Sequence, residues 1–101
     1  MVISWTNPAV KDLKEFKEIT KMTDVEEYLT TLVKEVNSLT HFPHMGKIYT
    51  YLHGKIIRQL VHAEHRILYY EQEEIIYIVA VIHHKQDIEE RIRYIQQHYE
   101  W

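Results

Sequence analysis

The sequence has no cysteine, only two glycines and two prolines, and no long run of apolar residues. Without cysteine the chain can form neither a disulfide framework nor a cysteine-ligated zinc site, and it has no thiol nucleophile. The shortage of glycine and proline leaves no flexible linker or low-complexity tail. No stretch approaches the roughly 18 apolar residues that a membrane-spanning helix needs, so we expect a cytoplasmic protein without a membrane partner.

The remaining composition is that of one globular domain. The 101 residues are 46% hydrophobic and 27% charged, and they carry a formal net charge of -3. We therefore predict a single domain over residues 1–101. The acidic balance disfavours a generic nucleic-acid binder, because counterion release rewards a basic surface. From His41 to Arg66, however, four lysines and arginines stand against the single Glu64, and this local excess of positive charge suits an anionic ligand.

The first half of the chain predicts a short strand and two helices. "VISWT" (2–6) has the composition of a strand. Asn-Pro at 7–8 supplies an N-cap and a first-turn proline for the helix that follows. A second helix begins at Asp24, where Glu27 completes a capping-box pattern, and apolar residues then repeat at three and four positions to about Leu39.

The second half predicts a sheet and a closing helix. "THFPHMGK" (40–47) is a loop, because its proline and glycine break the helical period. Asp87 starts the closing helix, with an apolar face that extends to Tyr99. Three strands are predicted between them: "GKIIRQLV" (54–61), "HRILYYE" (65–71) and "EIIYIVAVI" (74–82). The order β-α-α-β-β-β-α predicts an α+β domain with helices packed on a small, mostly antiparallel sheet.

Two arginines occur on consecutive predicted strands. By two-residue alternation Arg58 shares a face with Ile56 and Leu60. If that face is buried, the guanidinium must find a carboxylate or lie at an open rim. Arg66 begins the next strand, and its alternative is an ordinary exposed strand-end cation. Together the two side chains could grip a phosphate with forked hydrogen bonds.

His83 and His84 follow the last strand directly, and Lys85 comes next. If the strand continued through both histidines, they would point to opposite faces, so only one would serve a given site. A neutral imidazole at a rigid strand end can transfer a proton near pH 7, and Lys85 can offset negative charge on a phosphate. His62 and His65 lie three apart without an HExxH motif, so we expect neither a metal nor a cofactor.

Four segments, taken in order, resemble the RelE/ParE superfamily of bacterial toxins. They are "ISWTNPAVKDLKEF", "LTHFPHMGK", "RQLVHAEHRILYY" and "IIYIVAVIHHKQD", and together they cover nearly the whole chain. The resemblance implies the toxin of a two-gene toxin-antitoxin module, held inactive by a cognate antitoxin. RelE-like members enter the ribosomal A site and cut mRNA by attack of the RNA 2′-hydroxyl on the adjacent phosphate. ParE-like members inhibit DNA gyrase, and a third alternative is a toxin-like fold without activity.

For the cutting branch, the resemblance implies catalytic roles for three residues. Arg66 matches the arginine that contacts the scissile phosphate, and Arg58 matches a basic position one strand earlier. His84, with His83 as the alternative, falls near a general acid/base histidine. The further candidates for substrate binding are Lys47, Lys55, Lys85 and His83.

The chain also departs from the cutting relatives. It has "KIIRQ" where RelE has alternating lysines, no glutamate follows in the loop after Gly46, and Tyr94 already lies on the final helix. "VIHHKQD" suits the ParE side equally. The basic segment and the strand-end imidazole nevertheless have a use in RNA cleavage, which is why we favour it over gyrase inhibition as the expected activity.

Overall fold

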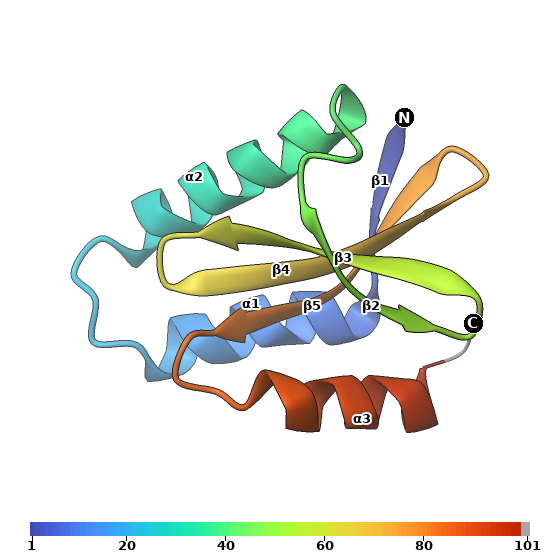
Figure 1. Cartoon of the computed structure of the whole chain (residues 1–101). Helices are drawn as coiled ribbons and strands as arrows, with labels where there is room; N and C mark the ends of the chain where they lie inside the picture. The colour runs from blue at the N-terminus through green and yellow to red at the C-terminus, as the bar shows by residue number, and fades with distance from the viewer. Residues whose placement is uncertain (100–101) are drawn as a thin grey trace.

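A computed structural model describes residues 1–99 as one five-stranded sheet with helices on both faces (Figure 1). The strands are β1 (Val2–Trp5), β2 (Lys47–Leu52), β3 (Lys55–His62), β4 (His65–Gln72) and β5 (Ile75–His83). They lie in the order β1-β5-β4-β3-β2, and only the β1–β5 pair is parallel. Of the domain predicted over residues 1–101, residues 100 and 101 lie outside the described part.

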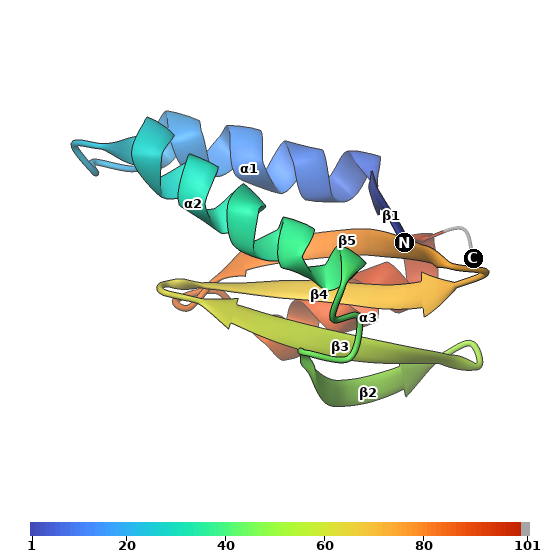
Figure 2. The same cartoon turned by 90° about the horizontal axis from the view of Figure 1, so that it is seen from above.

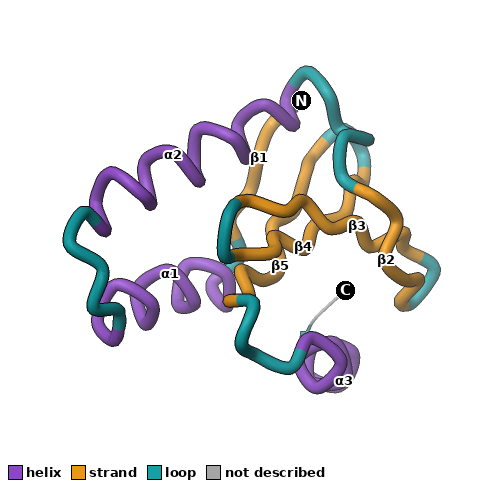
Figure 3. The backbone as a smooth tube through the Cα atoms, turned by 60° about the vertical axis from the view of Figure 1, so that its left-hand side comes forward, coloured by secondary structure: helices purple, strands orange, loops and turns teal. Residues whose placement is uncertain are grey.

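The helices sit on opposite faces of this sheet. They are α1 (Asn7–Ile19), α2 (Val25–Asn37) and α3 (Ile88–His98), and a short 3-10 turn (Ser38–Thr40) follows α2. In Figures 2 and 3, α1 and α2 lie side by side over one face, whereas α3 lies across the other. None of these helices combines the length and the apolar character that a membrane crossing requires.

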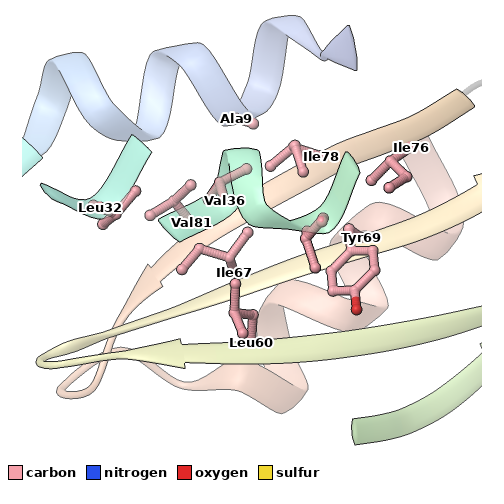
Figure 4. Close-up of a cluster of buried hydrophobic side chains, with 10 residues drawn as sticks. Ala9, Leu32, Val36, Leu60, Ile67, Tyr69, Ile76, Ile78 and Val81 are labelled. Carbon is pink, nitrogen blue, oxygen red and sulfur yellow. The ribbon is translucent and has the colours of Figure 1, made fainter. Parts of the chain in front are cut away.

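Each face of the sheet has its own hydrophobic core. Under α1 and α2 the buried residues include Leu32, Val36 and Ile67 (Figure 4). Under α3 they include Leu68 and Ile92. Because neighbouring residues of a strand point to opposite faces, β4 and β5 feed both cores at once. This explains why the β5 sequence is an almost unbroken apolar run.

A charged pair joins the two layers near the end of β5. Both guanidinium nitrogens Nη1 and Nη2 of Arg91 on α3 donate to Asp12 on α1 at 2.8 Å, and the Val81 amide donates to Asp12 Oδ2 at 2.8 Å. Burial raises the pKa of Asp12, while the hydrogen bond from Arg91 acts in the opposite direction. This paired carboxylate therefore fixes α3, and with it the start of that helix, against β5.

The loop before β2 is fixed by a glycine that no larger residue can replace. A Cβ on Gly46 would lie 2.7 Å from the carbonyl oxygen of Gln59 and 2.7 Å from the hydroxyl of Tyr69. That hydroxyl accepts the Gly46 N–H at 2.9 Å and donates to the Pro43 carbonyl oxygen at 2.8 Å. The path of the chain into β2, and hence the position of Lys47, is set by these contacts.

The α+β class and the mostly antiparallel sheet are confirmed, but the structure has one strand more than the sequence predicted. β2 was not predicted, and it joins β3 through a tight turn at His53 and Gly54, both with positive φ (49° and 76°). The cap of α1 also differs. The Ala9 N–H donates to Thr6 Oγ1 at 3.5 Å, so Thr6 rather than Asn7 is the N-cap.

Candidate functional site

An open pocket of about 580 Å³ lies over one end of the β2–β3–β4 region, beside the turn that follows β5. Its lining includes Lys47, Gln59, Glu64, His65, Arg66 and His84. Two cations, a carboxylate and an exposed imidazole thus border one space that is open to solvent. We call it the Arg66 pocket.

Strand register places the two cations on the same face of the sheet. Lys47 lies opposite Gln59 in the β2–β3 pairing, and Arg66 lies opposite Val61 in the β3–β4 pairing. Gln59 and Val61 are two residues apart on β3 and point the same way. Arg66 also alternates with Leu68, which packs under α3, so the Arg66 side chain lies on the α3 side of the sheet.

Arg66 is available to an anion. The side chain is half-buried, and its guanidinium forms no hydrogen bond or ion pair with any other of residues 1–99. Close by, the Tyr49 hydroxyl donates to Glu89 Oε1 at 2.7 Å. This hydrogen bond raises the pKa of Tyr49, while the positive charge of Arg66 acts to lower it. A planar guanidinium that keeps its donors free can bind two phosphate oxygens at once.

His83 and His84 lie together at the end of β5. The strand stops at His83, so the expected opposite orientation of the two side chains does not apply, and their ring centroids are 4.4 Å apart. His83 Nε2 lies 3.3 Å from Glu64 Oε2. The His84 N–H donates to the Glu64 carbonyl oxygen at 2.7 Å, which ties the turn after β5 to the β3–β4 turn. The His84 side chain is exposed at the mouth of the pocket.

His65 also lines the pocket, but its ring packs on the face of the sheet that α1 and α2 cover. Its side chain is only 2% exposed, its Nδ1 lies 2.8 Å from the Tyr28 hydroxyl, and the Phe16 ring packs edge-on with a centroid distance of 4.4 Å. Burial, assisted by the neighbouring His83, lowers the pKa of His65 to about 4. His65 is therefore neutral at physiological pH, and His84 is the histidine of the pocket lining whose side chain is exposed.

A comparison with protein families matches residues 3–88 to the ParE toxin of the parDE type II toxin-antitoxin system. The chain belongs to this family. The match confirms the superfamily that the four sequence segments predicted, and a toxin of a type II module has an antitoxin as its partner. A comparison with curated proteins gives no match.

The toxin does not bring Arg58 to the Arg66 pocket. Arg58 alternates with Leu60, which packs under α1 and α2, so Arg58 lies on the face opposite to Arg66. Its Nη1 donates to the Gly46 carbonyl oxygen at 2.9 Å. Arg58 thus lies at the rim of a separate open pocket, which Lys55 and Glu71 also line, and its hydrogen-bond partner is a backbone carbonyl rather than a carboxylate. The two arginines do not converge on one ligand.

The remaining predicted residues divide between the pocket and distant places. Lys55 begins β3, six residues before Val61 and hence about 20 Å away along the strand, and its Nζ lies 5.6 Å from the centroid of the Tyr70 ring. Lys85 is exposed next to His84, and the ring of His83 stacks on Phe16 with centroids 5.9 Å apart. The structure therefore gathers Lys47, Arg66 and His84, with His83 and Lys85 adjoining them.

Gln59 and Glu64 in the pocket lining, and Tyr49 beside Arg66, were not among the sequence candidates. Gln59 Oε1 is buried and accepts no hydrogen bond from residues 1–99, so it is an unused acceptor in the pocket wall. Tyr49 lies on the strand that was not predicted. Glu64 lies in the tight turn between β3 and β4, directly after Ala63, which has a positive φ of 48°. This turn directs the Glu64 side chain toward His83. Only the alternation of "KIYTYL" before "HG" could have indicated Tyr49 in advance.

Proposed function

We propose that this toxin cleaves mRNA on the ribosome and that the Arg66 pocket holds the scissile phosphate. The observation that carries the proposal is the convergence of Arg66, Lys47 and His84 on one open space. Cleavage through a 2′-hydroxyl requires cations around the phosphate and a base that takes up the hydroxyl proton. These three side chains supply both from the protein alone.

In this mechanism the RNA 2′-hydroxyl attacks the adjacent phosphorus, and the bond from phosphorus to the 5′-oxygen breaks. His84 accepts the proton of the 2′-hydroxyl, and water at the open rim gives a proton to the 5′-oxygen. Arg66 and Lys47 stabilise the negative charge that develops on the phosphate oxygens. The products are a cyclic 2′,3′-phosphate and a free 5′-hydroxyl.

The test uses ribosomes programmed with a defined mRNA, with the cut mapped at its 5′ end. Arg66→Ala should lower the cleavage rate by about 10²–10³-fold, and His84→Gln should lower it by about 10²–10⁴-fold. Arg66→Lys keeps the positive charge but loses the planar guanidinium that can bind two phosphate oxygens at once. Its cleavage rate should therefore lie between those of Arg66→Ala and the unchanged toxin. Arg93→Ala is the matched control, because Arg93 is an exposed cation on α3 outside the pocket. Unchanged cleavage in Arg66→Ala or His84→Gln contradicts the mechanism.

Inhibition of DNA gyrase is a second candidate, and the placement of Arg58 favours it. With Arg58 bound to the Gly46 carbonyl oxygen on the other face, the pocket has one cation fewer than the catalytic set that the cutting relatives imply. A gyrase inhibitor needs a complementary surface and no proton transfer. Its activity would therefore survive the loss of His84.

A gyrase supercoiling assay with the Arg66→Ala/His84→Gln double variant separates the two candidates. Messenger RNA cleavage by the unchanged toxin and none by the double variant supports the nuclease. Equal inhibition of supercoiling by both proteins, without transcript cleavage, supports the gyrase inhibitor.

A further inference from the structure

Three side chains at the mouth of the Arg66 pocket have the arrangement of a metal site. In Glu64, His83 and His84, one carboxylate oxygen and two imidazole nitrogens all lie within 4.8 Å of one another. Within residues 1–99 this is the one group of three such side chains that lies close enough to share an ion. We propose that it binds a divalent transition metal ion of the zinc class.

The spacing suits tetrahedral coordination. Bonds of about 2.0–2.2 Å from zinc to nitrogen and oxygen place neighbouring ligand atoms about 3.3 Å apart. His83 Nε2 and Glu64 Oε2 already lie 3.3 Å apart. His84 and Glu64 are both exposed, so rotation of their side chains can close the remaining gap. Two histidines and one glutamate also leave a fourth position open for water or a ligand.

Backbone contacts hold the three ligands in register before any ion arrives. His65 and His83 are paired across β4 and β5, and the His84 N–H donates to the Glu64 carbonyl oxygen. The His83 N–H also donates to Gln86 Oε1 at 2.8 Å. The ligands therefore come from two turns that are already joined, which lowers the ordering cost of binding.

Metal binding moves one proton on His83. The Lys85 N–H donates to His83 Nδ1 at 3.2 Å, so in the free protein the ring proton of neutral His83 is on Nε2 and points to Glu64. A metal ion on Nε2 requires the proton on Nδ1 instead. The Lys85 amide must then release His83 Nδ1, and because Lys85 is exposed this amide can bond to water.

The surrounding charge decides the class of ion. Arg66 and Lys47 line the same pocket and Lys85 adjoins it, so electrostatic attraction for a bare cation is weak. Mg²⁺ and Ca²⁺ prefer several oxygen ligands, whereas imidazole nitrogen suits zinc, copper and nickel. Affinity must come from coordination by nitrogen, and we expect zinc to bind and magnesium not to bind.

A bound zinc ion would also occupy the imidazole that the proposed cleavage needs. This consequence rests on the proposed function, whereas the metal site itself does not. Zinc should therefore inhibit mRNA cleavage, and Glu64→Gln, which removes a ligand, should make cleavage less sensitive to zinc.

Isothermal titration calorimetry of the full, untagged chain with zinc chloride tests the site. One zinc per chain is expected, with no heat from magnesium chloride. Glu64→Gln and His84→Gln should each weaken zinc binding by about tenfold or more, and both positions are exposed, so the fold tolerates the changes. His41→Gln is the matched control, because His41 is an exposed histidine outside the group. In NMR spectra, zinc should shift the Lys85 amide and the His83 ring nitrogens.

Zinc binding that is unchanged in His84→Gln, or that falls equally in His41→Gln, overturns the proposal, as does the absence of zinc uptake. The mRNA cleavage assay tests the proposed function and the inhibition by zinc independently of the binding measurement. Zinc uptake by a toxin that never cuts mRNA refutes the proposed function and leaves the metal site standing. Cleavage that continues at saturating zinc refutes the inhibitory consequence alone.

Discussion

At the residue scale, burial removes one histidine from acid-base chemistry and leaves its neighbours available. His65 and His83 face each other across β4 and β5 with ring centroids 5.2 Å apart. His65 is sealed by Phe16 and Tyr28, whereas His84 meets solvent. Residue type alone does not distinguish these histidines, because the distinction depends on the helices that cover each strand end.

The buried His65 should make the folded state sensitive to acid. Its pKa is about 4 in the folded chain, against an ordinary value of 6.5. As the pH falls from 6.5 toward 4, the unfolded chain binds the proton first, so the free energy of unfolding decreases. We expect a loss of at most about 1.4 kcal/mol per pH unit from this group. Urea unfolding between about pH 5 and 7 measures it.

His65→Gln keeps a polar side chain but does not titrate, so the pH dependence of its unfolding free energy should be flatter than that of the unchanged toxin. His41→Gln, an exposed histidine, should leave the slope as it was. Equal slopes for all three proteins refute the assignment of the acid sensitivity to His65.

At the same scale, strand-end positions made Arg66, His83 and His84 candidates, the family resemblance favoured Arg66 and His84, and both of these line one pocket. The sequence could not place Arg58. The alternation with Leu60 was correct, but alternation does not say which helices cover a face. That information lies in the packing of α1 and α2, whose contacts with β3 are far apart in sequence. Glu64 and Gln59 were missed for the same reason, since tertiary contacts define their roles.

At the element scale, the hairpin turns give uneven sequence signals, and the strand that was not predicted, β2, precedes the hairpin turn that contains a glycine. The turn before β3 contains His53 and Gly54, a pair whose glycine is a usable signal. The turns before β4 and β5 contain Ala63, Glu73 and Glu74 with positive φ values of 48°, 53° and 64°. Positive φ is unfavourable for such residues, so the amino-acid composition gives little sign of these two turns. The strands on either side of them were predicted from their runs of β-branched residues instead.

The turn between β4 and β5, at Glu73 and Glu74, offers a stabilising change. Glu73→Asn/Glu74→Gly replaces two exposed residues in the left-handed region with the pair that a tight hairpin prefers. The Glu74 carbonyl oxygen still accepts the Val2 N–H, because that contact uses the backbone. We expect the free energy of unfolding to rise by about 1 kcal/mol, measured by urea unfolding.

Glu15→Gly is the control of opposite sign. Glu15 is exposed in the middle of α1, where glycine has the lower helix propensity and should cost about 1 kcal/mol. A double variant that unfolds at a lower urea concentration than the unchanged toxin would show that the turn tolerates its glutamates without strain.

At the scale of the whole molecule, the two cores cannot separate without breaking the sheet that both share. Ile67 packs under α1 and α2, and the next residue, Leu68, packs under α3. The Asp12–Arg91 pair joins α1 directly to α3. A chain built this way should behave as one cooperative unit, which is the single domain that its length and composition predict.

Cooperative unfolding can be checked with one probe in each core. Trp5 packs against the core under α1 and α2, and Trp101→Phe leaves it as the only tryptophan, since the sequence has two. The amide signals of Ile92 and Ile95 report on α3. Because both cores share β3, β4 and β5, Trp5 fluorescence and the α3 amide signals should give the same urea midpoint. Loss of the α3 signals at a lower urea concentration would instead mean that α3 detaches as a separate unit before the rest of the toxin unfolds.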